Sequence, residues 1–315
     1  MNAEQQPERI ILGATDIRIS PMGIGTWAWG DRWYWGYGRT YNEADVQGAF
    51  RAASAAGINL YDTAEVYGFG RSERLLGQFA HGDGQQVAIA TKFMPFPWRL
   101  RRQSLVHALK GSLNRLEMEQ VVLYQIHWPF PPVAIETWME GLAEVVKEGL
   151  ALAVGVSNYN VDQLRRAHAA LASWGVPLAS NQVEYSLWQR DPERTGLLDA
   201  CRELGVTLIA YSPLAQGLLT GKYTADSPPP GLRRRRIRRR RLLQIEPLIA
   251  LLREIGEAAG GKTPAQVALN WLICKGTVPI PGAKNAQQAE GNVGALGWRL
   301  TDEQVSALDT ASAPT

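Results

Sequence analysis

Short apolar runs alternate with longer segments of mixed apolar and polar character along most of the chain. The short runs lack helical periodicity and predict buried strands, whereas the longer segments carry apolar residues at helical spacing. The predicted strands are 22–25, 58–61, 87–91, 121–126, 151–156, 178–183, 206–210 and 278–280. The predicted helices that follow them are 43–56, 72–79, 103–115, 135–147, 161–171, 192–204, 243–259 and 286–296. Repeated strand–helix steps of this kind predict a parallel sheet that closes into a (β/α)₈ TIM barrel.

Three further segments fit around such a barrel. The segment 10–19 has a turn between two short alternating runs, which predicts a β-hairpin. Helices are predicted at 264–274 and 302–308, outside the repeating units. A barrel needs about 250 residues, so a chain of 315 residues is expected to form one domain, 1–315, with the hairpin and the extra C-terminal helices attached.

Composition agrees with an ordinary globular chain. Hydrophobic residues make up 45% and charged residues 20% of the sequence. The first ten residues are polar and no apolar run approaches the roughly 18 residues of a membrane span, so no membrane association is expected. Two cysteines are too few for a disulfide framework, and a reducing, cytoplasmic location is the expectation.

The basic character of the chain comes from one segment. Residues Arg233–Arg241 contain eight arginines, and without them the formal net charge of +3 becomes −5. Such a run is typical of a solvated loop and less often of a polyanion-binding site. Electrostatic binding of nucleic acid through it is possible, but no nucleic-acid-binding motif accompanies it.

Polar, titratable residues stand where three consecutive predicted strands end. Asp62 follows the strand 58–61, Lys92 follows 87–91 and His127 follows 121–126, while Tyr67 comes one short loop after Asp62. A lone histidine after a strand is more often a core residue, and a lone aspartate is often a helix cap. In a (β/α)₈ barrel, however, all of these ends lie at the C-terminal face, where active sites are found.

The blocks GINLYDTAEVYGFGRSERLLG, ATKF and LYQIHWP resemble the signature segments of the aldo-keto reductase family. The similarity extends from about Ile19 to the end of the chain. It implies a barrel whose N-terminal mouth is closed by the hairpin, and an enzyme that reduces aldehydes or ketones with NADPH. The four residues at the strand ends would then be catalytic.

The chemistry of carbonyl reduction suits these four side chains. Hydride must reach carbon and a proton must reach oxygen. A tyrosine hydroxyl can supply the proton if a nearby cation favours the phenolate. We therefore expect Tyr67 to be the acid, Lys92 to be that cation and Asp62 to hold the ammonium. His127 is expected to orient the carbonyl and, near its titration range, to assist the proton transfer.

The resemblance also implies a cofactor site. Its residues would be Ser157, Asn158, Gln182, Tyr211, Ser212, Leu214, Gln216, Gly217, Lys284, Gln288 and Asn292. Ser157, Asn158 and Gln182 match positions that bind the nicotinamide carboxamide, and Tyr211 matches the ring that stacks on the nicotinamide. Lys284 stands before a predicted helix, where a cation and free N–H groups favour a phosphate, so NADPH is expected over NADH. The chain departs from the family pattern at Gly291, where relatives usually carry an acid.

Two nucleotide-binding motifs have better structural explanations. The pattern G-x-G-x-x-A at 23–28 is not followed by a helix and is interpreted as the first barrel strand. The P-loop pattern at 256–263 follows a helix rather than a strand. Gly260 and Gly261 are expected to end that helix, and Thr263 to cap the next one in a capping box with Gln266. No metal site is expected.

Aromatic residues after the strands predict an apolar substrate pocket. The expected wall is Trp27, Trp29, Phe93, Trp98 and Trp128, with the segment 33–35 as a lid or pocket edge. Such a pocket selects carbonyl compounds by shape and apolar area, so a broad substrate range is expected. The physiological substrate and the oligomeric state stay open.

Two other functions remain possible from the sequence. Some proteins that resemble this family are NADPH-binding regulatory subunits with slow turnover, similar to the potassium-channel β subunits, and they retain the same four residues. A polyanion-binding scaffold built on the arginine run is the other; salt-sensitive binding that survives loss of Tyr67 would support it.

Overall fold

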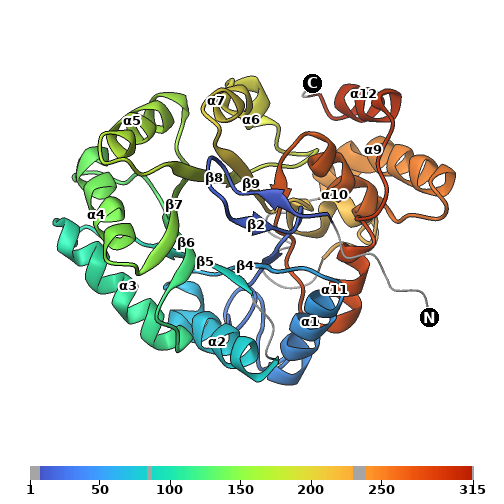
Figure 1. The fold of residues 1–315 in the computed structure, drawn as a ribbon. Helices are drawn as coiled ribbons and strands as arrows, with labels where there is room; N and C mark the ends of the chain where they lie inside the picture. The colour runs from blue at the N-terminus through green and yellow to red at the C-terminus, as the bar shows by residue number, and fades with distance from the viewer. Residues whose placement is uncertain (1–7, 84–86, 230–238, 314–315) are drawn as a thin grey trace.

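The computed structural model describes residues 8–83, 87–229 and 239–313. Its centre is a parallel sheet in which each strand pairs with the next one along the chain (Figure 1). The strands are β3 (Ile24–Gly25), β4 (Leu60–Asp62), β5 (Ala88–Phe93), β6 (Val121–Ile126), β7 (Ala151–Ser157), β8 (Leu178–Glu184), β9 (Thr207–Tyr211) and β10 (Val278–Pro279). This order of parallel neighbours confirms the predicted (β/α)₈ arrangement.

The first strand meets the segment that follows the last one. Gly25 forms a parallel bridge with Gly282, and the Gly23 and Gly25 amides donate to the carbonyls of Pro279 and Pro281, each at 3.0 Å. A Cβ atom on Gly25 would lie 2.9 Å from the Ile280 carbonyl oxygen. The glycine therefore allows the backbones to approach closely enough to close the barrel, and the motif at 23–28 is a barrel strand as expected.

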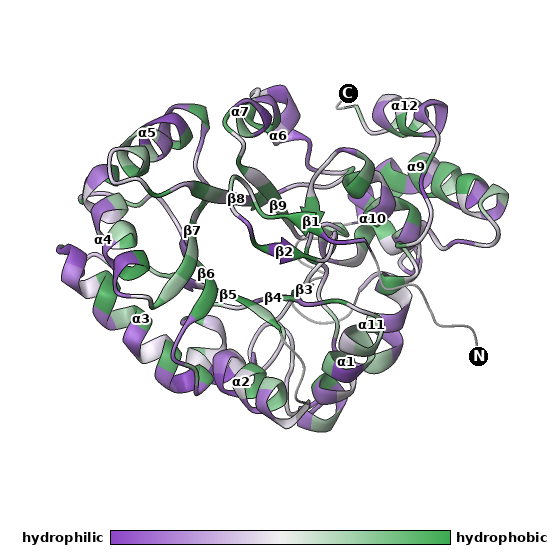
Figure 2. Ribbon diagram, in the orientation of Figure 1, coloured by the Kyte–Doolittle hydropathy of each residue, from purple (hydrophilic) through white to green (hydrophobic). Residues whose placement is uncertain are grey.

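Helices surround the strands and turn their apolar sides toward them (Figure 2). They are α1 (Glu43–Ala55), α2 (Arg71–Asp83), α3 (Arg102–Leu116), α4 (Ile135–Lys147), α5 (Val161–Ala172), α6 (Asp191–Arg194), α7 (Leu197–Glu203), α9 (Arg239–Ala258), α10 (Pro264–Cys274), α11 (Ala286–Val293) and α12 (Asp302–Ala311). The predicted helix 192–204 is instead two helices, because Gly196 between them has φ 73° and interrupts the helical path. Most of the arginine run 233–241, which was expected to be a solvated loop, lies outside the described residues. Its last residues, from Arg239, form the start of α9.

The hairpin of β1 (Ile10–Ile11) and β2 (Arg18–Ile19) covers the N-terminal mouth. The Gly13 amide in its turn donates to Thr207 Oγ1 at 2.7 Å, at the start of β9. A Cβ on Gly13 would lie 2.4 Å from the Ala179 carbonyl oxygen near the start of β8, so the turn presses against the strands. These contacts confirm the hairpin and its place as a plug.

The strands separate two apolar layers. Small and medium side chains fill the barrel interior together with Leu12 and Ile19 of the plug, and a larger layer packs between the strands and the helices. Along β5, Ala88 and Ala90 face the interior layer, so strand alternation places Lys92 on the same side. The Lys92 side chain is thus directed into the barrel interior, which the plug closes at the N-terminal end.

The P-loop-like segment is a helix–helix junction, as expected. Gly260 and Gly261 both have φ 83° after α9. The Thr263 side chain accepts from the Gln266 amide, and the Gln266 side chain accepts from the Thr263 amide, which completes the predicted capping box at the start of α10. Among the described residues, no helix is long and apolar enough to cross a membrane.

Substitution of Thr263 by alanine is expected to lower the free energy of unfolding by about 1 kcal/mol, because the cap of α10 loses its acceptor. Urea unfolding of the two proteins measures this difference. Thr263→Ser keeps the hydroxyl and serves as the control, with stability close to that of the parent protein. Equal loss in both variants would show that the hydroxyl does not matter.

Candidate active site

Lys92 and Asp62 form a buried ion pair at the C-terminal end of the barrel. Lys92 Nζ lies 2.5 Å from Asp62 Oδ1, and it also donates to the Thr63 carbonyl at 2.8 Å. The lysine side chain is fully buried. Burial by itself lowers the pKa of Lys92, but the charges and hydrogen bonds of Asp62 and Tyr67 together outweigh this effect and leave the pKa above its ordinary value. The ammonium therefore stays charged inside the protein.

Tyr67 stands beside this ion pair. It begins the short 3₁₀ segment η1 (Tyr67–Gly70), and its hydroxyl lies 3.4 Å from Lys92 Nζ. Burial raises the pKa of the Tyr67 hydroxyl, while the Lys92 ammonium acts in the opposite direction. The Lys92 ammonium thus favours loss of the phenolic proton, and burial of the hydroxyl opposes it.

His127 completes the predicted group of four. Its ring meets the Tyr67 ring edge to face, with the centroids 5.8 Å apart. Its Nδ1 is buried and makes no hydrogen bond to any described residue. Burial and the repulsion of the Lys92 ammonium lower the pKa of His127 to about 3. The imidazole is therefore neutral near pH 7, and it can position a partner by hydrogen bonding rather than by charge.

Two amides hold the other carboxylate oxygen of Asp62. Gln182 Nε2 donates to Asp62 Oδ2 at 2.7 Å, and Gln125 Nε2 reaches the same oxygen at 3.4 Å. Gln125 was not predicted, although a glutamine inside the apolar strand 121–126 was a signal that could have revealed it. The side chain of Gln182, expected from the family pattern to meet the cofactor, directs its nitrogen at Asp62.

A second ion pair, also missed by sequence reasoning, ties the Tyr67 loop to the loop after Lys92. Arg99 donates through Nη1 and Nη2 to Glu65 at 2.5 and 3.0 Å, and Arg99 Nη1 also donates to the Met94 carbonyl at 2.9 Å. The Met94 amide donates to Glu65 Oε1 at 2.7 Å. Both partners are largely buried. This clamp fixes the separation between the loop that carries the acid and the loop that follows the cation on β5.

The residues predicted to bind a carboxamide form one hydrogen-bonded group. Asn158 Nδ2 donates to the His127 carbonyl at 3.0 Å and to Ser157 Oγ at 3.1 Å. The Tyr211 hydroxyl donates to Asn158 Oδ1 at 3.0 Å, and Ser157 Oγ donates to the Gln182 carbonyl at 2.7 Å. The structure therefore brings the ends of β7, β8 and β9 together next to His127.

The loop after β9 is strained where the sequence predicted a pyrophosphate contact. Ser212, Ala215 and Gln216 have positive φ values of 50°, 47° and 57°, and Gly217 follows with φ 98°. Leu214 lies between them, at the start of η2 (Ala215–Thr220). Left-handed backbone at non-glycine residues carries a conformational cost and clusters at functional sites. The backbone here is held in a shape that its own sequence does not favour.

The predicted adenosine-phosphate residues surround the start of α11. Gln288 Oε1 accepts from the Lys284 amide at 3.0 Å, and the Asn285 side chain caps the helix through the Gln288 amide. Asn292 is buried and its Nδ2 donates to the Gly282 carbonyl at 3.3 Å. Lys284 Nζ lies against the rings of Trp35 and Tyr41. Gly291 has open space around it.

The predicted aromatic wall is only partly at the mouth. Trp27 lies 6.4 Å from the Tyr67 ring, centroid to centroid, and Trp128 stacks on Phe130 beyond His127. Trp98 is 73% exposed and lines a surface groove with residues of α3.

Trp29 and Phe93 correct the prediction. Both are fully buried. Trp29 packs on Phe79 and donates to the Ala283 carbonyl, and Phe93 packs on Trp138. Strand alternation turns Phe93 toward the helices, because its neighbour Lys92 faces the interior. Neither side chain offers surface to a substrate, so both belong to the core.

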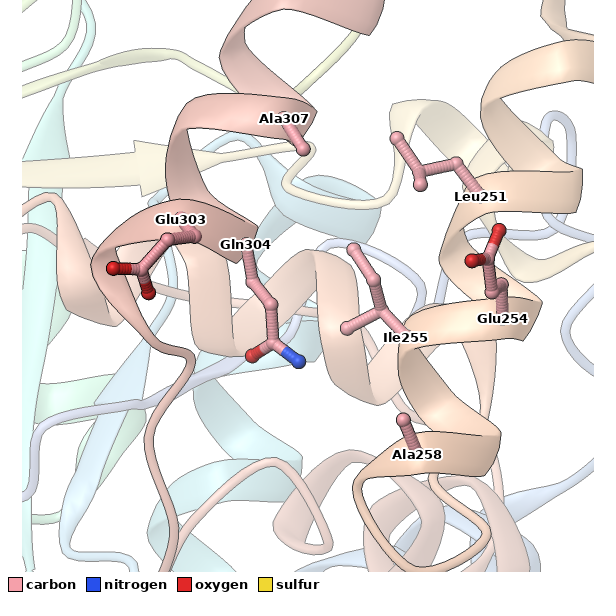
Figure 3. A pocket seen from close by; sticks show the side chains of 7 residues that line it. All are labelled: Leu251, Glu254, Ile255, Ala258, Glu303, Gln304 and Ala307. Carbon is pink, nitrogen blue, oxygen red and sulfur yellow. The ribbon is translucent and has the colours of Figure 1, made fainter.

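A groove elsewhere on the molecule is lined by no lysine, tyrosine or histidine of the described residues. It lies between α9 and α12, on the outer layer, and has an apolar floor with acidic side chains at its edges (Figure 3). Its lining residues are Leu251, Glu254, Ile255, Ala258, Glu303, Gln304 and Ala307.

No set of three or more potential metal ligands is grouped within the described part of the chain. The barrel mouth is therefore the candidate active site.

Comparison with known proteins agrees with this geometry. A sequence model of the Aldo/keto reductase family matches residues 21–313. The chain belongs to the aldo/keto reductase family. It is 45% identical to the chloroplast pyridoxal reductase of Arabidopsis thaliana over 309 residues, which cover 94% of this chain and 84% of that protein. The family resemblance proposed from the sequence blocks is thus confirmed.

Solved structures of the family have the same fold. The glycerol dehydrogenase of Gluconobacter oxydans superimposes with a TM-score of 0.85 at 28% identity, covering 99% of this chain and 96% of that one. An aldo-keto reductase of Klebsiella pneumoniae in complex with NADPH gives a TM-score of 0.76 at 26% identity, covering 98% and 96% of the two chains. Membership of this family makes the chain an oxidoreductase of the barrel type.

The low pKa of His127 predicts a loss of stability in acid. The unfolded chain binds a proton on this residue below about pH 6.5, whereas the folded protein does so only near pH 3. The free energy of unfolding should therefore fall as the pH drops from about 6.5 toward 3, by roughly 1 kcal/mol per pH unit from this residue.

Urea unfolding between pH 7 and pH 4.5 tests this expectation. His127→Gln should flatten the pH dependence, and the exposed His107→Gln should leave it as in the parent protein. Parallel curves for His127→Gln and the parent protein would contradict the neutral, buried imidazole.

Proposed function

We propose that this protein is an NADPH-dependent carbonyl reductase in which Tyr67 is the proton donor. The observation that carries the proposal is the contact of Lys92 Nζ with both Asp62 and the Tyr67 hydroxyl at a buried strand end. A charged lysine paired with one carboxylate and directed at one phenol is suited to stabilising a developing phenolate. It is the arrangement that the reaction needs.

Each residue then has one task. Bound NADPH supplies the hydride that the carbonyl carbon receives. Tyr67 gives its hydroxyl proton to the carbonyl oxygen, so that the C=O bond becomes C–OH and the phenolate stays beside Lys92. Asp62 keeps the ammonium in place, and Gln182 and Gln125 keep Asp62 in place. The neutral imidazole of His127 orients the carbonyl oxygen by a hydrogen bond.

The chain's own residues suit an NADPH molecule. The polar group of Ser157, Asn158 and Tyr211 next to His127 provides donors and acceptors for a carboxamide. The loop that the family pattern assigns to the pyrophosphate has positive φ at Ala215, Gln216 and Gly217, a backbone conformation that clusters at ligand-binding sites. Lys284, with Gln288 and Asn292 on α11, provides a cation for a further phosphate. The NADPH complex of the Klebsiella relative supports this assignment.

The proposed substrate is an aldehyde or ketone with a flat, apolar body. The Trp27 ring lies 6.4 Å from the Tyr67 ring, centroid to centroid, Trp128 directly follows His127, and both tryptophans are partly exposed. Flat rings are recognised by such side chains through stacking. The identity with a protein named pyridoxal reductase makes pyridoxal the first compound to test. A cytoplasmic location is part of the same proposal.

Tyr67→Phe is expected to remove most reduction of aldehydes while leaving NADPH affinity nearly unchanged, because only the proton donor is lost. Oxidation of NADPH followed by its near-ultraviolet absorbance, over a panel that includes pyridoxal, measures turnover; calorimetric titration measures binding. Unchanged turnover in Tyr67→Phe would reject Tyr67 as the acid. Binding of NADPH without turnover of any aldehyde by the parent protein would favour a regulatory, cofactor-sensing role instead.

Lys284→Ala is expected to weaken NADPH binding by roughly tenfold or more and to leave NADH binding nearly unchanged. The reason is that a charge-assisted contact to a phosphate contributes about 1.5–3 kcal/mol, and NADH lacks the 2′-phosphate. Calorimetric titration with both cofactors gives the ratio of the two dissociation constants. Equal weakening of both would argue against a 2′-phosphate contact.

A further inference from the structure

Lys284 is held in a cage of aromatic rings that the family comparison does not assign. Its Nζ lies 4.6 Å from the centroid of the Trp35 ring and 4.6 Å from that of Tyr41. The same nitrogen donates to the Trp35 carbonyl at 3.2 Å. These contacts join two parts of the chain that are about 250 positions apart. The ammonium is therefore confined from two sides by the loop after β3.

The loop that supplies the rings is itself firmly built. The Asp31 side chain accepts from the amides of Tyr34 and Trp35 at 2.8 and 3.3 Å. The Tyr41 hydroxyl donates to the Ala28 carbonyl at 2.5 Å, and Tyr41 is only 7% exposed. We name residues 27–41 the aromatic strap. These bonds hold the strap at both of the residues that supply the rings.

The aromatic strap also contacts the rest of the proposed cofactor site. The Tyr34 hydroxyl donates to Gln216 Oε1 at 2.6 Å, on the strained loop after β9. Trp35 meets Trp27 edge to face at 5.4 Å between centroids, and Trp27 faces Tyr67. The strap thus spans the distance from the acid to the lysine. Its rings are therefore positioned to contact a ligand that lies between Tyr67 and Lys284.

Confinement of a lysine side chain lowers the entropic cost of its pairing with a phosphate. A free lysine side chain samples many rotamers, and pairing with a phosphate costs most of that freedom. Ring faces attract the ammonium without neutralising it, because the attraction is to the quadrupole of the ring rather than to a negative charge. A caged ammonium therefore meets a phosphate with part of its ordering already completed.

We propose that Trp35 and Tyr41 determine cofactor specificity by holding the Lys284 ammonium in position for the 2′-phosphate of NADPH. The inference rests on the proposed function, since it requires that Lys284 meets that phosphate. It adds that the preference for NADPH over NADH comes from the strap as well as from the lysine. Loss of either ring lowers that preference and leaves NADH affinity unchanged.

The test is calorimetric titration of each protein with NADPH and with NADH, in the absence of any carbonyl substrate. Trp35→Leu and Tyr41→Leu each remove one ring of the cage. Tyr41→Phe is the matched control, because it keeps the ring and removes only the hydroxyl that bonds to Ala28. Thermal unfolding of every variant shows that each is folded at the temperature of the titration.

The expected result is a three- to tenfold fall in the NADPH preference for Trp35→Leu and for Tyr41→Leu, in line with the usual strength of a cation–π contact. Tyr41→Phe should retain the preference of the parent protein. Lys284→Ala should lose at least as much of the preference as either ring variant. The double variant of Lys284→Ala with Trp35→Leu should lose no more than Lys284→Ala alone, because both act through one ammonium.

Other outcomes overturn the inference in distinguishable ways. If Lys284→Ala lowers the preference but the two leucine variants keep or raise it, the phosphate contact stands and the cage has no role in selection. If the leucine variants weaken NADPH and NADH equally, the strap supports the site in general and does not select a cofactor. If Lys284→Ala leaves the preference intact, the proposed phosphate contact itself is wrong, and the inference fails with it.

Discussion

The ion pair of Lys92 and Asp62 is the interaction on which the rest of the site depends. A buried ammonium is costly unless a carboxylate and further acceptors surround it. Here the acceptors are Asp62 and the Thr63 carbonyl, and two glutamine amides fix the second carboxylate oxygen. Removal of one partner of such a pair leaves an uncompensated charge and typically costs about 3–5 kcal/mol. The barrel brings residues from β4, β5, β6 and β8 together at one point.

Burial and one cation together set the protonation of both neighbouring groups. The Lys92 ammonium makes loss of the Tyr67 proton easier and gain of a proton by His127 harder. At Tyr67, burial opposes formation of the phenolate and so acts against the cation. At His127, burial and the cation both oppose protonation. The two residues therefore respond differently to one environment. The result is a protonated phenol beside a neutral imidazole near pH 7. This pairing suits an acid and a hydrogen-bonding partner for one carbonyl oxygen.

Positions around the ion pair are held by contacts that cross between loops. The clamp of Glu65 and Arg99 fixes the loop of the acid to the loop after the cation. Strained backbone at Asn158, Ser212 and Gln216 is kept in place by the strands before it. The aromatic strap connects Tyr67 to Lys284 through rings in tilted and edge-to-face contact. In each case a rigid barrel bears the conformational cost of loops that carry chemistry.

The sequence by itself determined the barrel, the hairpin, the cap at Thr263 and the four polar residues at or near the strand ends, whereas the place of the hairpin as a plug came from the family resemblance. These depend on local patterns: strand alternation, capping residues and the rule that parallel strands end on one face. Only the tertiary structure decided that Gln125 supports Asp62, that Phe93 belongs to the core and that Lys284 lies between two rings. Those outcomes depend on which side chains meet across distant segments. A one-dimensional pattern gives the face on which a side chain lies, whereas its partner is chosen by the packing of the whole barrel.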